Sequence, residues 1–409
     1  MFSRVDYFFR FLSLTKRLAN NISLHIAYES GRKNANEELE SLGLLMVFSL
    51  PHPLFTRLYA VGWVLLYWAI YFFFRDFFPD KALADAREIQ DIAMGLKEGG
   101  VGAYPITAAF FALLPLSITN ILVGLFDGLV LYLVASSART YRGMFILVPI
   151  LIPFIFFNLQ APTKETIILA LSLLIVNVVQ RTRTALMPVI AVTVFYAFYG
   201  SFLRDYYLII LVVFLAFVVF INTPASMRWL FVPTGIAILV LVPDSVFTAL
   251  QQPRDEVNFW VVTGGAKDAI RTYFFNPFPP DSMLHFLGNY GYALVLLHFP
   301  FIKYITPKEV LMFVNVLFYG WLTLGGIVQL RGSLRLLPVL FAAHVAVLVL
   351  FEPDFGSYFR HFSSCLLYLM PVFLVYEIRY VHFLESRRAE DKRKVMTRAT
   401  GMGSEKKAL

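Results

Sequence analysis

Apolar runs long enough to cross a lipid bilayer follow one another along most of this 409-residue chain. Hydrocarbon offers no hydrogen bonds to the backbone, so such runs must form helices or a closed barrel. The runs show no alternation of period two, which favours helices. A composition with 58% hydrophobic and 15% charged residues is also unusual for a soluble globular protein. The sequence therefore predicts an all-α, polytopic integral membrane protein.

The positions of Lys and Arg orient the chain, because basic segments tend to stay in the cytoplasm. The stretch 384–409 holds eight Lys or Arg residues against four acids, and the first forty residues are also basic. We expect both termini to be cytoplasmic, with interfacial helices over 1–55, a transmembrane domain over 56–382 and a basic tail over 383–409. Juxtamembrane charge explains the basic ends without nucleic-acid binding.

Two larger loops, 76–105 and 243–309, are expected on the external side. If 284–304 crossed the membrane, Arg331, Arg335 and the basic tail would all lie outside. A re-entrant or interfacial element there restores the positive-inside pattern. About ten spans result: 58–74, 105–137, 145–159, 166–179, 186–201, 207–221, 229–242, 310–329, 336–351 and 362–380.

This topology places four groups of charged residues on the external side, where they become candidates for function. Lys164 and Glu165 begin the run "KETIILAL" after Thr163, which can cap a helix. Glu165 suits the first turn of a helix, whereas Lys164 gains nothing from the helix dipole. Lys164 is therefore a candidate for holding an anion; the alternative is that it reaches toward lipid phosphates.

Arg360 and His361 lie in "FEPDFGSYFRHFSS", just before the last span. Arginine suits phosphate or carboxylate binding, and histidine can take or give a proton near neutral pH. The alternative is a simple ion pair between Glu352 and Arg360. Arg254 and Arg271 are further cations, on an expected amphipathic helix for which an interfacial role is the alternative.

The first external loop offers Asp80, Asp85 and Glu88 as candidate general bases. The alternative is that they are solvated surface acids. The chain has one cysteine, Cys365, and no P-loop, HExxH or nucleophile-elbow motif. We expect neither a metal nor another cofactor.

The stretches "APTKETIILAL", "NPFPPDS" and "FGSYFRHFSS" give the chain a pattern that resembles Wzy-type polymerases of O-antigen, capsule or exopolysaccharide, and related membrane glycosyltransferases with lipid-linked donors. The resemblance implies transfer of an oligosaccharide from undecaprenyl diphosphate to another repeat unit, at the outer face of the bacterial inner membrane. The metal-binding DxD pattern of some glycosyltransferases is absent from the first loop.

The resemblance also implies roles for individual residues. The candidates for catalysis are Asp80, Asp85, Glu88 and His361. The candidates for binding the substrate and its diphosphate are Lys164, Glu165, Arg254, Arg271 and Arg360. Membrane lipids and other polysaccharide export proteins are the further expected partners. A transporter or flippase of lipid-linked sugars and a polysaccharide ligase remain alternatives, because both would handle the same diphosphate.

Overall fold

The computed structural model describes residues 53–74, 80–99, 102–182, 184–263, 273–303 and 305–405. The chain in these ranges is helical without β-strands, apart from an isolated antiparallel bridge between Tyr273 and Asp354. The predicted all-α class is therefore confirmed for this part of the chain. The expected interfacial helices before Pro53 lie outside the described residues.

The helices of the first half are α2 (Pro53–Phe73), α3 (Asp80–Ala93), α4 (Ala103–Phe111), α5 (Leu116–Ala135), α6 (Tyr141–Asn158), α7 (Lys164–Arg181), α8 (Leu186–Phe202) and α9 (Tyr206–Asn222). Those of the second half are η3 (Ala225–Leu230), α10 (Phe231–Leu241), α11 (Asp244–Thr263), α13 (Met283–His298), η4 (Pro300–Ile302), α14 (Pro307–Gln329), η5 (Gly332–Arg335), α15 (Leu336–Phe351), α16 (Phe355–Ser364), η6 (Leu366–Tyr368) and α17 (Met370–Glu405).

Six helical segments of the described chain are long and apolar enough to cross a bilayer: Leu54–Phe73, Leu116–Ala135, Tyr141–Asn158, Pro307–Gln329, Gly332–Phe351 and Leu366–Arg387. A further pair, Ala225–Leu241 with Asp244–Val261, passes the same test but bends by 91° at its break. The apolar helices α8 and α9 are shorter. This arrangement is compatible with a multi-pass membrane protein.

The two loops expected to be large and external contain further helices. The first contains α3 and the beginning of α4, and the second contains α11, α13 and η4. The segment for which a re-entrant or interfacial element was expected forms α13, which is a single 16-residue helix, followed by η4.

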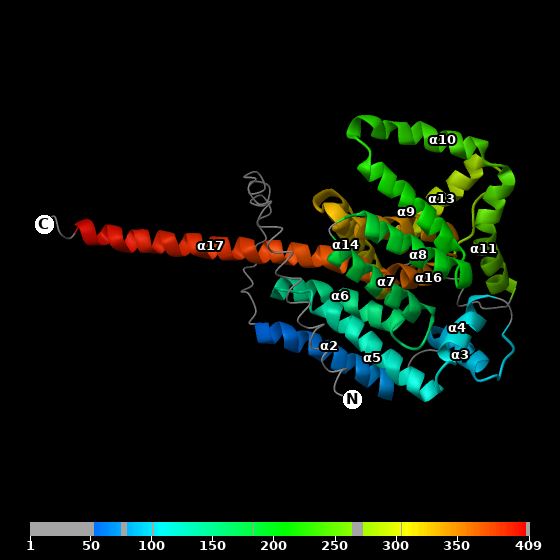
Figure 1. The fold of residues 1–409 in the computed structure, drawn as a ribbon, viewed down its shortest axis with the longest axis horizontal. Helices are drawn as coiled ribbons and strands as arrows, with labels where there is room; N and C mark the ends of the chain where they lie inside the picture. The colour runs from blue at the N-terminus through cyan, green and yellow to red at the C-terminus, as the bar shows by residue number, and fades with distance from the viewer. Residues whose placement is uncertain are drawn as a thin grey trace.

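The apolar helix α15 lies at the centre of the bundle, where it packs against α7, α9, α11, α13, α14 and α16. A helix that is apolar on all sides is expected to be surrounded in this way. Figure 1 shows α17 projecting from one end of the bundle, whereas α3 and α4 lie at the opposite end. That opposite end, where α7 begins and α15 stops, carries the candidate site.

Candidate functional site

The short helix α16 holds Arg360 and His361 at the end of the bundle. Asp354 caps this helix, because its Oδ1 accepts hydrogen bonds from the backbone N–H groups of Gly356 (2.7 Å) and Ser357 (3.1 Å). The large apolar side chains of α16 are buried in the core of the bundle: Phe355, Tyr358, Phe359 and Phe362. This anchored apolar face leaves Arg360 and His361 to line a cavity beside the helix.

The cavity has a volume of about 1020 Å³. That value is near the upper end of the roughly 300–1,000 Å³ occupied by small-molecule sites. Its polar lining includes Asp85, Asp205, Lys308, Glu352, Asp354, Arg360 and His361. Its apolar lining comes from α6, α9, α11 and the end of α15: Phe156, Phe157, Ile209, Leu250, Val257 and Phe351. One cavity therefore offers both charged and apolar walls.

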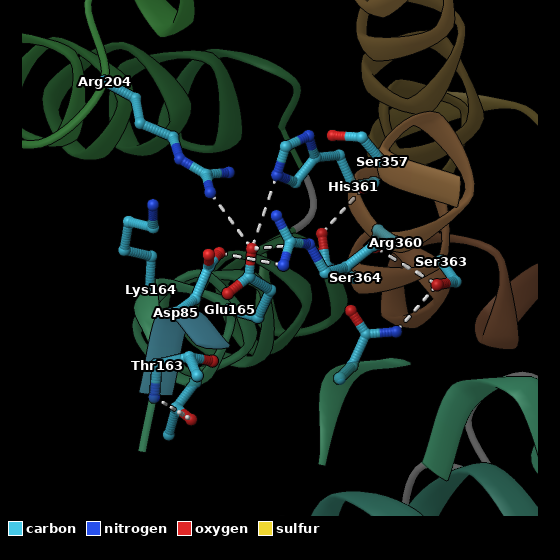
Figure 2. Close-up of polar contacts among 12 residues, drawn as sticks. Asp85, Thr163, Lys164, Glu165, Arg204, Ser357, Arg360, His361, Ser363 and Ser364 are labelled. Atoms are coloured by element: carbon cyan, nitrogen blue, oxygen red, sulfur yellow. Dashed lines mark hydrogen bonds and ion pairs between the residues drawn. The ribbon is translucent and has the colours of Figure 1, made fainter. Parts of the chain in front are cut away.

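Glu165 is buried, and its Oε1 lies close to three basic side chains (Figure 2). Nη2 of Arg204 lies at 3.0 Å, Nε2 of His361 at 3.4 Å and Nε of Arg360 at 3.6 Å. A buried carboxylate requires such partners, because losing its hydration costs several kcal/mol. Glu165 therefore joins the start of α7 to the end of α8 and to α16.

Asp85 of α3 forms the second ion pair of Arg360, with Oδ2 2.9 Å from Nη1. The other carboxylate oxygen of Asp85 accepts a hydrogen bond from the hydroxyl of Tyr104 at 2.9 Å. Burial alone would raise the pKa of Asp85, but the charges of Arg360 and Lys164 outweigh it and lower the pKa. Asp85 is therefore an ionised partner of Arg360 at neutral pH.

Lys164 is the first residue of α7 and is buried. Its Nζ lies 3.7 Å from the ring centroid of Tyr104, which gives it a cation–π contact. Burial lowers the pKa of Lys164 to about 8, and the nearby charge of Arg204 adds to this effect. Lys164 therefore approaches its titration range at slightly alkaline pH.

His361 and Glu352 form the remaining polar pair of the site. Nδ1 of His361 hydrogen-bonds to Oε1 of Glu352, and both side chains are buried. Burial would raise the pKa of Glu352, but His361 lowers it. Glu352 holds Nδ1, and the other ring nitrogen, Nε2, is buried and faces Oε1 of Glu165 at 3.4 Å.

The structure brings together five of the residues expected from the sequence: Asp85, Lys164, Glu165, Arg360 and His361. The expected simple ion pair of Glu352 with Arg360 is replaced by three other pairings. Glu352 contacts His361, whereas Arg360 contacts Asp85 and Glu165.

Other expected residues lie apart from this cluster or cannot be placed. Glu88 forms an exposed ion pair with Lys97 at 2.8 Å. Arg254 is fully buried and donates to the side-chain oxygen of Asn276 at 3.1 Å and to the carbonyl of Val349. Asp80 begins α3, but its side chain lies outside the described part of the chain, as does all of Arg271.

Arg204 belongs to the ion-pair network of Glu165 and was omitted from the sequence-based predictions. It follows the apolar run of α8, a position that looks like an ordinary polar joint. In the structure its guanidinium donates to Glu165 and, at 3.0 Å, to the hydroxyl of Tyr206. The sequence did offer one indication of this pair: Arg204 lies in a connection between two apolar runs that is expected on the same side of the membrane as Glu165.

Comparisons with protein families, characterised proteins and solved structures give no significant match. Within the described residues, no group of three or more His, Cys, Asp or Glu side chains is arranged to hold a metal ion.

Proposed function

We propose that this protein polymerises lipid-linked oligosaccharide repeat units into an envelope or exported polysaccharide at the outer face of the bacterial inner membrane. The observation that carries the proposal is the convergence of Arg360, His361 and Glu352 on one cavity at one end of an apolar helix bundle. The undecaprenyl-diphosphate donor has a charged head and an apolar chain, which suit the charged and apolar walls of this cavity.

Arg360 is the side chain best suited to the diphosphate of the donor. It lines the cavity and belongs to the buried ion-pair network of Glu165. Guanidinium groups bind phosphate oxygens through paired, charge-assisted hydrogen bonds. Lys308 also lines the cavity and adds a second cation. Positive charge at these positions would stabilise the diphosphate as it leaves with the bonding electrons.

His361 is our candidate for the general base. In the proposed reaction the acceptor hydroxyl attacks the anomeric carbon of the donor sugar, a new C–O bond forms, and the bond from that carbon to the diphosphate oxygen breaks. Nε2 of His361 would take the hydroxyl proton, while Glu352 holds the opposite nitrogen and balances the positive charge gained by the ring. Atoms and charges are then conserved without a further reactant.

The expected ten spans belong to this proposal. They would be α2, α5, α6, α7, α8, α9, α10, α14, α15 and α17, with α11 and α13 on the external side. Alternation of these spans puts the start of α7 and the ends of α8 and α15 on the same side. Support comes from the contacts of Glu165 and His361, which join those three helix ends.

A deletion strain tests the proposed activity. We expect single repeat units to remain on the lipid carrier and long polymer to disappear, with recovery on complementation. Polymer of normal length in the deletion strain would refute a polymerase. Normal polymer that stays on its lipid carrier would indicate a ligase, and an accumulation of units on the cytoplasmic face would indicate a flippase.

Cysteine labelling tests the orientation. Cys365 is buried, so replacing it with serine gives a background for single cysteines at position 298 and at the C-terminus. A membrane-impermeant reagent should label position 298 from outside intact spheroplasts and leave the C-terminus unlabelled. External labelling of the C-terminus would overturn the ten-span topology.

A further inference from the structure

Two cations of the site are both covered by the helical pair α3–α4. Asp85 of α3 pairs with Arg360 at 2.9 Å, and the ring of Tyr104 of α4 lies 3.7 Å from Nζ of Lys164. Tyr104 also donates a hydrogen bond to Asp85 at 2.9 Å, which connects the two contacts. The helical pair α3–α4 therefore provides a contact to each of the two cations, Arg360 and Lys164.

The pair α3–α4 has an apolar anchor that does not depend on these polar contacts. Ile89 of α3 packs with Ala108 and Phe111 of α4, and this cluster also contacts Val123 of α5 and Ile167 of α7. Apolar burial of this kind holds the helices in place. The ion pair between Asp85 and Arg360 is thus not required to keep α3 beside the bundle.

The position of Asp85 suits exchange with a ligand. The side chains of Asp85 and Arg360 are 23% and 27% exposed, and both residues line the cavity. A carboxylate and a phosphate offer a guanidinium the same pair of acceptor oxygens. After such an exchange Arg360 keeps its second contact, because the buried Glu165 lies 3.6 Å from its Nε.

We propose that Asp85 occupies the position on Arg360 that a phosphate group would take, and that a diphosphate ligand binds by displacing it. This inference rests on the proposed function for the nature of the ligand. It assigns Asp85 a regulatory role, in which its side chain occupies Arg360 until a phosphate competes for the guanidinium.

This role and a general-base role for Asp85 predict opposite outcomes. A general base needs a carboxylate that accepts a proton readily, whereas the ion pair with Arg360 stabilises the ionised form. Removing the charge from a general base would abolish activity and leave phosphate affinity little changed. Removing the charge from a competitor would tighten phosphate binding.

Calorimetric titration of inorganic pyrophosphate into the purified full-length protein in detergent tests the proposal. For Asp85→Asn we expect pyrophosphate to bind about three- to tenfold more tightly, because the substitution removes one partly exposed charge that competes for Arg360. Tyr104→Phe, which loosens Asp85 by one hydrogen bond, should tighten binding less but in the same direction. Asp91→Asn removes a charge from the same helix and is the matched control, with unchanged affinity. Arg360→Gln should abolish binding.

Unchanged or weaker pyrophosphate binding by Asp85→Asn would overturn the proposal, as would a lack of binding by both the wild type and this variant. If Asp85→Asn does not yield a monodisperse protein, the direction of the Tyr104→Phe effect decides. The result is separable from the proposed function: normal polymer in a deletion strain would refute the polymerase, while tighter binding by Asp85→Asn would still establish the exchange at Arg360.

Discussion

Nδ1 of His361 hydrogen-bonds to Oε1 of Glu352 across the turn that joins α15 to α16. Glu352 is the C-cap residue of α15, and Asp354 fixes the start of α16, so both ends of the turn are defined. The imidazole is therefore held in one orientation, with Nε2 on the side of Glu165 at 3.4 Å. The pair has the form expected of a histidine base oriented by a carboxylate.

Replacing His361 with glutamine should lower polymer formation by about 10²- to 10⁴-fold, the usual contribution of a positioned general base. Glu352→Gln should cost less, because Nε2 can still accept the proton while the orientation of the ring is lost. Polymer length and amount in complemented deletion strains, normalised to membrane protein level, provide the measurement. Wild-type polymer with His361→Gln would exclude this histidine as the base.

The start of α7 shows how far local sequence patterns reach. The helix begins at Lys164 directly after Thr163, as the capping pattern predicts, and the N–H of Thr163 donates to Oγ1 of Thr166 at 3.5 Å. The local pattern did not predict which of Lys164 and Glu165 has more contacts with charged side chains of other helices. Glu165, explained locally as a first-turn acid, is the centre of the ion-pair network, because its partners come from α8 and α16.

Such contacts between distant helix ends cannot be read from hydrophobic periodicity. The pattern predicts where each apolar run stops, and the positive-inside rule suggests which runs stop on the same side. Neither says which ends meet in space. Arg204 was missed for this reason: its partner Glu165 lies 39 residues earlier in the chain.

Arg204 should act as a positioning residue for Glu165. Arg204→Met would leave a buried carboxylate with one direct ion-pair partner fewer, a change that costs about 3–5 kcal/mol in comparable buried pairs. We expect a lower thermal midpoint and reduced polymer formation, since Arg360 and His361 share the same carboxylate oxygen.

Arg204→Lys provides the control for this positional role. The lysine keeps the charge near Glu165 but cannot also reproduce the contact to the Tyr206 hydroxyl through a planar guanidinium. It should recover part of both stability and polymer formation. An unchanged thermal midpoint and full activity of Arg204→Met would show that Glu165 does not depend on it.

Lys164 gives a prediction with a defined pH window. Its pKa is lowered by burial to about 8 in the folded protein, against about 10.4 for an unfolded lysine. Between these values the unfolded state binds more protons, so stability rises as the pH increases from 8 to 10. The cost of the buried charge near neutral pH is on the order of 3 kcal/mol.

Lys164→Met should therefore raise the thermal midpoint at pH 7, and the difference from wild type should shrink as the pH approaches 10. Thermal unfolding of both proteins in the same detergent across pH 6–10 measures this. Lys308→Met, which removes an exposed cation that also lines the cavity, is the matched control for the loss of one positive charge. A constant difference between Lys164→Met and wild type at all pH values would contradict the assigned cause.

Arg254 is expected from its surroundings to stabilise the fold rather than bind diphosphate. Pro353 has no N–H to offer the carbonyl of Val349 in the last turn of α15, and Arg254 donates to that carbonyl instead. A cation at a helix C-terminus is also favoured by the helix dipole. Removing this donor leaves a buried acceptor unsatisfied, which costs about 1–3 kcal/mol.

Arg254→Met should accordingly lower the thermal midpoint while the folded fraction still binds pyrophosphate with wild-type affinity, in contrast to Arg360→Gln. Asn276→Ala serves as the companion variant, because it removes the other hydrogen-bond acceptor of Arg254 without changing charge. This variant should also lower the thermal midpoint. If Arg254→Met has a normal thermal midpoint but no longer binds pyrophosphate, Arg254 would be a diphosphate-binding residue, as the sequence analysis expected.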